Sequence, residues 1–113
     1  MIAKELIKGT IRTIVLSLLA ENKRMYGYEI MQKIEDKTDG KIKLTMGSLY
    51  PILHKLENDG LIYSETENIG KRVRKYYLLT STGEREKSKK VSELKDFLST
   101  INSIIDKGGI ADA

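Results

Sequence analysis

Apolar residues along this chain recur mainly at the three- and four-residue spacing of amphipathic helices. Leu49, Ile52, Leu53 and Leu56 follow this spacing and fall on one stripe of a helix within residues 44–64. The opposite face is small and uncharged in its first half, and a helix N-terminus favours phosphate. We therefore expect this face to approach a polyanion. It carries Gly47, Ser48, Tyr50, Pro51, His54, Lys55 and Asn58.

Turn-forming residues bound this helix on both sides. Residues 58–60, Asn-Asp-Gly, are a helix C-terminal signal. Thr45 and Ser48 are both candidate N-caps. With Ser48 as the cap, Pro51 lies in the first turn, where its missing amide costs nothing; with Thr45 as the cap, Pro51 should kink the helix. The sequence leaves both starts open.

Two further helices are predicted before this one. Residues 2–20 carry a broad apolar stripe, wide enough to contact both the rest of the domain and a neighbouring chain. Residues 21–25 are polar and should form the connection. Residues 26–39 predict a second, shorter helix that Gly40 ends, and residues 41–44 predict a very short strand.

A β-hairpin follows the central helix. Residues 61–67 and 72–79 are rich in Tyr, Val, Ile and Thr, and residues 68–71 join them. Charge at the tip of a hairpin protects its edges, and it can also contact a polyanion. Because the hairpin directly follows a helix whose outer face can approach phosphate, we favour contact with the same polyanion. The basic residues at the tip are Lys71, Arg72, Arg74 and Lys75.

The last predicted helix is long and amphipathic. Residues 81–84 have the Ser-x-x-Glu spacing of a capping box, and the helix should run to about Lys107, with a frayed tail over residues 108–113. Its apolar residues have the a/d spacing of a coiled-coil seam, which indicates a homodimer, although an ordinary helix packed on its own core has the same pattern. The predicted seam is Val91, Leu94, Leu98, Ile101 and Ile105.

Composition narrows the classes of function. The 113 residues suit one domain, and the net charge of +4 is concentrated within residues 41–79, where seven basic residues face four acidic ones. This asymmetry favours a nucleic-acid surface over a lysine-rich solvated one. The chain has no cysteine, which excludes disulfides and thiolate metal sites, and charged residues interrupt any N-terminal membrane span. We expect a cytoplasmic protein without a cofactor or metal.

An enzyme finds little support in the sequence. His54 is the only histidine, it has no cysteine partner, and the turn after the helix should point Asp59 elsewhere. The glycines are scattered and form no phosphate-binding loop. A domain that binds another protein instead of a nucleic acid is the remaining alternative.

The order of the elements is three helices, a basic hairpin and a long helix. This is the order of a winged helix-turn-helix domain at residues 1–79 followed by a dimerisation helix at residues 80–107. Specific motifs in it resemble the PadR-like transcriptional regulators, in particular their short subfamily with a single C-terminal helix. The matching motifs are KGT at 8–10, YGYEI at 26–30, GSLYPILHKLE at 47–57, GLI at 60–62, RKYYLLT at 74–80, and Gly83.

The resemblance implies a homodimeric repressor that places its third helix in the major groove of double-stranded DNA and its wing beside neighbouring phosphates. A small aromatic or phenolic effector would release it. Such effectors are associated with the dimer interface near the first and last helices, which points to Ile7, Ile11, Val15 and Phe97. The candidate DNA-binding residues are Tyr26, Thr45, Ser48, Tyr50, His54, Lys55, Asn58, Lys71, Arg72, Arg74 and Lys75.

Sequence readout by the central helix is expected to be limited. Ser48, His54 and Asn58 are the available readers of base edges, while lysine and arginine supply phosphate contacts. No arginine lies on the outward face, so shape readout and water-mediated contacts should contribute. Two-fold symmetry predicts a pseudo-palindromic operator with half-sites about 34 Å apart.

Overall fold

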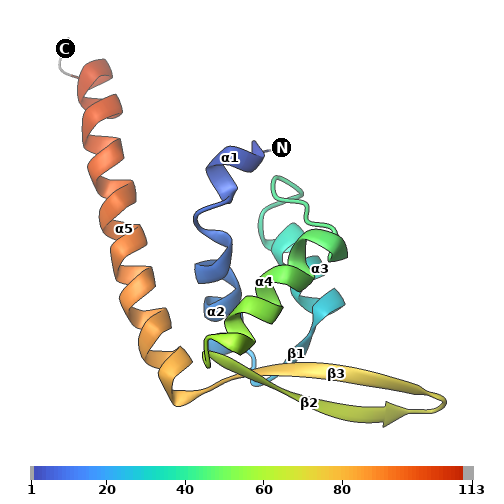
Figure 1. Ribbon diagram of the computed structural model, residues 1–113. Helices are drawn as coiled ribbons and strands as arrows, with labels where there is room; N and C mark the ends of the chain where they lie inside the picture. The colour runs from blue at the N-terminus through green and yellow to red at the C-terminus, as the bar shows by residue number, and fades with distance from the viewer. Residues whose placement is uncertain (1, 111–113) are drawn as a thin grey trace.

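The computed structural model describes the backbone of residues 2–110 and the side chains of residues 2–106. Helices α2, α3 and α4 pack together above a β-hairpin, and α5 rises along the other side of the molecule (Figure 1). This is a mainly helical winged helix-turn-helix fold with a long last helix, which confirms the predicted class. The elements in chain order are α1 (Lys4–Ile7), α2 (Ile11–Glu21), β1 (Met25–Tyr26), α3 (Gly27–Lys37), α4 (Met46–Asn58), β2 (Ile62–Ile69), β3 (Arg72–Leu79) and α5 (Ser81–Ile110).

The core forms where α2, α3 and α4 meet the sheet. Three of the four predicted stripe residues of α4 are fully enclosed, and Ile52 is half-buried at the edge of the core. Burial of such side chains is worth about 1.5 to 3 kcal/mol each, so this stripe fixes which face of α4 points outward. The side chains with no exposed surface are Val15, Ile30, Leu49, Leu53 and Leu56.

The single helix expected over residues 2–20 is wrong, because the chain turns at residues 8–10 and forms α1 and α2 instead. The Thr10 amide and hydroxyl both donate to the Ile7 carbonyl, at 2.8 and 2.9 Å. These bonds close a tight turn around Gly9. The apolar spacing continues across the turn, which is why periodicity alone does not reveal the break.

The sheet has three antiparallel strands in the order β1-β3-β2, one strand more than the predicted hairpin. Residues 21–25 were expected to be a polar connection only, but Met25 is buried and pairs with Tyr77, while Tyr26 pairs with Tyr76. The short strand β1 therefore ties the start of α3 to the hairpin.

Residues 41–44 do not form the predicted strand. The Ile42 amide donates to the Thr38 hydroxyl at 3.1 Å, and the Ile2 amide donates to the Lys41 carbonyl at 2.7 Å. The backbone groups of this segment are used to cap α3 and to bind the N-terminus. The segment therefore pairs with no strand among the described residues.

Helix α4 begins after Thr45, which settles the choice of N-cap. The Thr45 hydroxyl accepts from the Ser48 amide at 3.1 Å, and Pro51 lies inside the helix. The predicted C-terminal signal is confirmed: Gly60 has φ of +75°, and the Leu61 amide donates to the Leu56 carbonyl at 3.0 Å. This is a Schellman motif, which turns the chain directly into β2.

The hairpin is confirmed, with a shorter connection than predicted. Ile69 pairs with Arg72, which leaves only Gly70 and Lys71 in the turn. Gly70 has φ of +60°, as a two-residue turn with glycine first requires. Both strands are eight residues long, so the basic tip projects well beyond the core.

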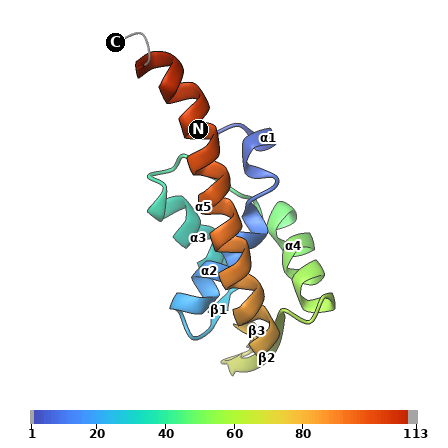
Figure 2. The ribbon, with the colours of Figure 1, turned by 90° about the vertical axis from the view of Figure 1, so that its left-hand side faces the viewer.

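Helix α5 starts one residue earlier than the capping box suggested. Thr80 is the cap, since its hydroxyl accepts from the Gly83 amide at 2.9 Å. The helix continues to Ile110, through half of the expected tail; residues 111–113 lie outside the described residues. Its first half packs on α2, and residues 95–106 are exposed as it extends past the body (Figure 2).

Candidate nucleic-acid interface

The outward face of α4 is exposed as predicted. Its seven residues named from the sequence are all solvent-accessible, and Tyr50 keeps 52% of its surface. The buried stripe on the opposite side packs the helix into the core. The outer face is therefore available to a partner without any change in packing.

Two of the candidate contact residues, Thr45 and Ser48, are committed to the start of α4. The Ser48 hydroxyl donates to the Thr45 carbonyl at 2.9 Å and accepts from the Thr45 amide at 3.1 Å. A hydroxyl has one donor and two acceptor positions, so little capacity remains for a base edge. The side chains of His54 and Asn58 form no hydrogen bond among the described residues, so they are better placed to contact base edges.

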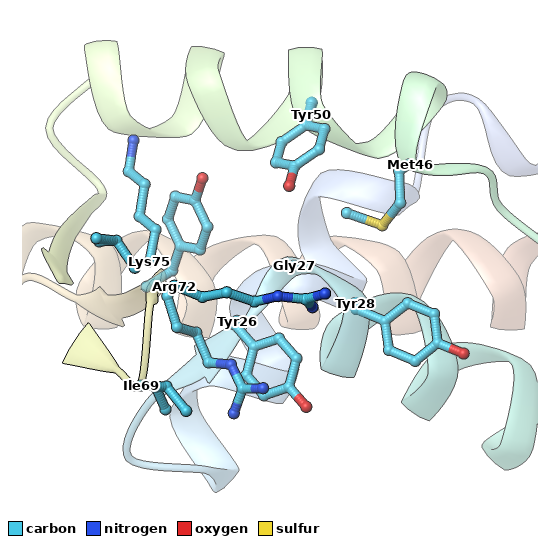
Figure 3. A pocket seen from close by; sticks show the side chains of 11 residues that line it. Tyr26, Gly27, Tyr28, Met46, Tyr50, Ile69, Arg72 and Lys75 are labelled. Atoms are coloured by element: carbon cyan, nitrogen blue, oxygen red, sulfur yellow. The ribbon is translucent and has the colours of Figure 1, made fainter. Parts of the chain in front are cut away.

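A cleft of about 380 Å³ lies between α4, the start of α3 and the wing. Met46 and Tyr50 enter it from α4, and wing side chains approach from the other side (Figure 3). Its lining combines tyrosines and three cationic side chains with the apolar Met46, Ile69 and Val73, and no acidic side chain lines it. Such a lining suits a phosphodiester backbone.

Arg74 and Tyr26 connect the two sides of this cleft. The Arg74 guanidinium lies 4.0 Å from the centroid of the Tyr26 ring, which in turn packs edge-on against Tyr76 at 5.7 Å. A hydrogen bond to Tyr76 raises the pKa of Arg74 above its ordinary value. Arg74 is thus held as a cation in a fixed position at the cleft.

Lys75 has an acidic neighbour on α4. Its ammonium lies 3.6 Å from the Glu57 carboxylate, and Glu57 also accepts from the Ser64 hydroxyl at 2.9 Å. Beside it, burial raises the pKa of Tyr77. The Lys75 charge is therefore partly balanced within the protein, unlike those of Lys71 and Arg72, which form no ion pair among the described residues.

The C-terminal end of the α4 face holds a negative charge that the sequence did not place there. Asp59 accepts from Arg12 at 2.9 Å and lies 3.3 Å from Lys55. The hydrogen bond from Arg12 lowers the pKa of Asp59 below its usual range, and Lys55 adds to this. Asp59 therefore reduces the attraction of Lys55 for an anion.

Arg24 was missed because it lies in the segment expected to be a polar connection. Its guanidinium stacks 3.8 Å from the Tyr76 centroid and bonds to Glu67 at 2.6 Å. This hydrogen bond raises the pKa of Arg24. Arg24 therefore links β2 to the segment before β1, and no sequence signal predicts this contact.

The proposed seam residues of α5 fall into two groups. Val91 and Leu94 are half-buried near α2, whereas Leu98, Ile101 and Ile105 are exposed, at 56%, 39% and 63%. They leave an apolar row that no described part of this chain covers. Single exposed apolar residues are ordinary, but a continuous row on one helix indicates a contact surface.

The four candidate effector residues are not gathered into one site. Val15 has no exposed surface, and Ile7 and Ile11 line a groove against α4. Phe97 instead lines a separate groove between α5 and the first two helices. Within one chain these four residues therefore lie in three different surroundings.

A metal-binding cluster and a membrane-spanning helix are both absent from the described part of the chain. No group of three or more His, Asp or Glu side chains there is arranged to hold a metal ion. No helix within residues 2–110 is both long and apolar enough to cross a bilayer. Together, an exposed helix and a basic wing around one cleft define the winged helix-turn-helix class of regulators.

Comparison with known proteins identifies the family. The model of the family described as "Transcriptional regulator PadR-like family" matches residues 15–89, and the chain belongs to this family of non-enzymatic, DNA-binding regulators. A curated relative, a transcriptional regulator of Mycobacterium tuberculosis, is 31% identical over 80 residues, which are 71% of each chain.

Solved structures agree in fold over almost the whole chain. A transcriptional regulator from Clostridium thermocellum has a TM-score of 0.83 at 34% identity, covering 91% of this chain and 97% of that one. A PadR family transcriptional regulator from Eggerthella lenta has a TM-score of 0.79 at 31% identity, covering 89% of this chain and 86% of that one. The predicted membership of the family is confirmed.

Proposed function

We propose that this regulator is a cytoplasmic homodimeric repressor that binds a pseudo-palindromic operator and is released by a small-molecule effector. The observation that supports the DNA contact is that Tyr50 of the α4 outer face and the basic side chains of the wing line two sides of one acid-free cleft. In this arrangement α4 enters the major groove, and the wing grips the adjoining phosphates.

The division of labour within the interface follows from the side chains. Lys71, Arg72 and Arg74 supply sequence-independent affinity through phosphate contacts. His54 and Asn58 supply the base contacts, because the hydroxyls of Thr45 and Ser48 are engaged in capping. With so few readers, DNA shape contributes to the choice of site.

The dimer rests on the uncovered apolar row of α5. A domain of this size has little further surface with which to cover Leu98 and Ile105, and a second copy of the same helix is complementary in chemistry. Two-fold symmetry then places two α4 helices about one helical turn of DNA, roughly 34 Å, apart. Release by an effector is the part of the proposal that the family resemblance suggests, with Ile7, Ile11, Val15 and Phe97 as its candidate residues near the dimer interface.

The test is DNA binding and footprinting. The full chain is titrated with DNA from upstream of its own coding region, and with a scrambled duplex of equal length, at several salt concentrations. We expect tighter binding to the upstream DNA and a footprint with two-fold symmetry. Absence of any binding at low salt would favour the alternative of a winged-helix module that binds another protein, and an asymmetric footprint would contradict the dimer.

A further inference from the structure

A second groove lies outside the cleft described above. It encloses about 370 Å³ between the N-terminal segment and the start of α4, a size within the usual range of small-molecule sites. Its floor is aliphatic, and no aromatic side chain lines it. The floor residues are Ile2, Ile7, Ile11, Leu44 and Ile52.

The rim of this groove is cationic. Lys4, Lys8 and Lys43 are exposed around it, and none of them has an ion-pair partner among the described residues. Arg12 also lines the groove, but its charge is already matched by Asp59. Because no acidic side chain lines the groove, the three ammonium groups repel one another and favour an anion between them.

We propose that this groove binds a medium-chain aliphatic carboxylate. The alkyl chain lies on the isoleucine and leucine floor, and the carboxylate lies among Lys4, Lys8 and Lys43. Both halves of the ligand are needed: a bare anion leaves the aliphatic floor wet, and an uncharged alkyl chain leaves the lysines unpaired. An aliphatic ligand fits better than an aromatic one because the lining offers no ring on which to stack.

The groove also borders the start of the proposed recognition helix. Thr45 and Ser48, which cap α4, also line it, and Thr45 follows Lys43 by two residues. A bound carboxylate therefore brings negative charge next to the α4 outer face. If the proposed function holds, on which this step alone rests, the ligand weakens DNA binding.

The binding test uses the full chain without DNA. We expect decanoate, added to isotope-labelled protein, to shift the amide resonances of Ile7, Leu44 and Ile52 in a saturable way. Decanol at the same concentration tests the charge, acetate tests the alkyl chain, and 2-naphthoate tests the preference for an aliphatic body. We expect each of these three to bind at least tenfold more weakly than decanoate, for three different reasons. Decanol lacks the charge-assisted hydrogen bond, acetate lacks the alkyl chain that covers the aliphatic floor, and 2-naphthoate brings a ring for which the lining has no stacking partner.

A matched pair of variants locates the anion site. Lys43→Glu should weaken decanoate about tenfold, whereas Lys23→Glu changes the net charge equally at an exposed position that does not line the groove and should leave binding unchanged. Both side chains are exposed, so the fold is retained, and Lys8→Glu serves as a second rim variant. Equal binding of decanol or naphthoate, or shifts confined to α5, would overturn the proposal.

The effect on DNA is measured separately. Decanoate should weaken binding of the wild-type protein to upstream DNA and have a smaller effect on Lys43→Glu. A protein that binds decanoate in the groove but binds no DNA would contradict the proposed function and leave the carboxylate site intact. A protein that binds DNA but shows no shifts in the groove would contradict the carboxylate site alone.

Discussion

The guanidinium of Arg74 stacks 4.0 Å from the ring centroid of Tyr26, so a wing residue and the N-cap residue of α3 hold one another at the proposed phosphate cleft. A cation over the face of an aromatic ring is attracted by it, which holds the Arg74 side chain beside Tyr26. The wing is therefore fixed to the body of the domain at this point.

The first prediction concerns the wing. Replacing Arg72 and Arg74 by Ala should weaken binding to every DNA sequence and lower the salt slope, by about 0.9 for each phosphate that the protein no longer neutralises. Lys89→Ala, on an exposed position of α5, is the control and should keep the slope. The measurement is the affinity at four or more salt concentrations. A double variant with the wild-type slope would remove the wing from the interface.

The second prediction distinguishes residues that recognise bases from residues that contact phosphates. His54→Ala should weaken binding to the operator about tenfold, the effect of removing one hydrogen bond to a base, and should leave binding to a scrambled duplex nearly unchanged. Lys71→Ala should weaken both by a similar factor, because a phosphate contact carries no sequence information. Competition between the two duplexes measures the ratio, and equal losses for His54→Ala would place it outside the base-reading set.

The third prediction concerns Asp59. Asp59→Asn should tighten DNA binding, because it frees Lys55 and removes a negative charge from the edge of the α4 face. The pKa of Asp59 is lowered in the folded protein, so its contribution to stability is present above about pH 4 and is lost as the pH falls through the lowered value.

The stability part of this prediction has its own measurement. Chemical unfolding should show the variant less stable than the wild type at pH 7, with the difference vanishing in acid below about pH 4. Asp106→Asn, an exposed position near the end of α5, should show neither effect. A difference that grew on acidification would contradict the assigned direction.

The fourth prediction tests the apolar row of α5. Leu98→Lys places a charge in the proposed dimer contact and should shift the protein to monomer in sedimentation velocity. Thr100→Lys, about 200° around the same helix, adds the same charge on the other side and should remain a dimer. A dimeric Leu98→Lys protein would mean that the interface lies elsewhere.

The fifth prediction concerns the base of α5. A methyl group added at Gly83 would overlap the Leu61 carbonyl oxygen and approach Leu79. Gly83→Ala should therefore destabilise the protein by about 1 to 3 kcal/mol, as overpacking does. Gly9→Ala is the comparison, since nothing lies within 4 Å of its added methyl, and it should change stability far less. Thermal unfolding distinguishes the two.

The parts of this protein that follow local rules were predictable from its sequence. The stripe of α4, its exposed face and its Schellman end depend on residues within one helix, so periodicity and turn chemistry identify them. The strand at Met25 and Tyr26 is too short to show a period, and it exists only because β3 lies beside it. The contacts of Arg24 and Arg74 likewise depend on tertiary register, which no local pattern encodes.

The break at residues 8–10 shows a different limit. Apolar residues continue at spacings of four and three from Ile7 to Ile11 and Ile14, so a straight helix and a turned chain have the same pattern. Tertiary contact of the N-terminus with Lys41 favours the turn. As a result, the groove proposed as a carboxylate site could not be foreseen, because its walls exist only when α1 folds back toward α4.

The junction at the base of α5 has a mechanical consequence. The Thr80 amide donates to the Leu61 carbonyl at 3.1 Å, its hydroxyl donates to the Gly60 carbonyl at 2.7 Å, and Gly83 packs directly against Leu61. These contacts join the first turn of α5 directly to the end of α4 and the start of β2. Helix α5 is therefore a rigid extension of the domain. In a dimer formed along α5, a small change in the angle between the two α5 helices must therefore change the distance between the two α4 helices.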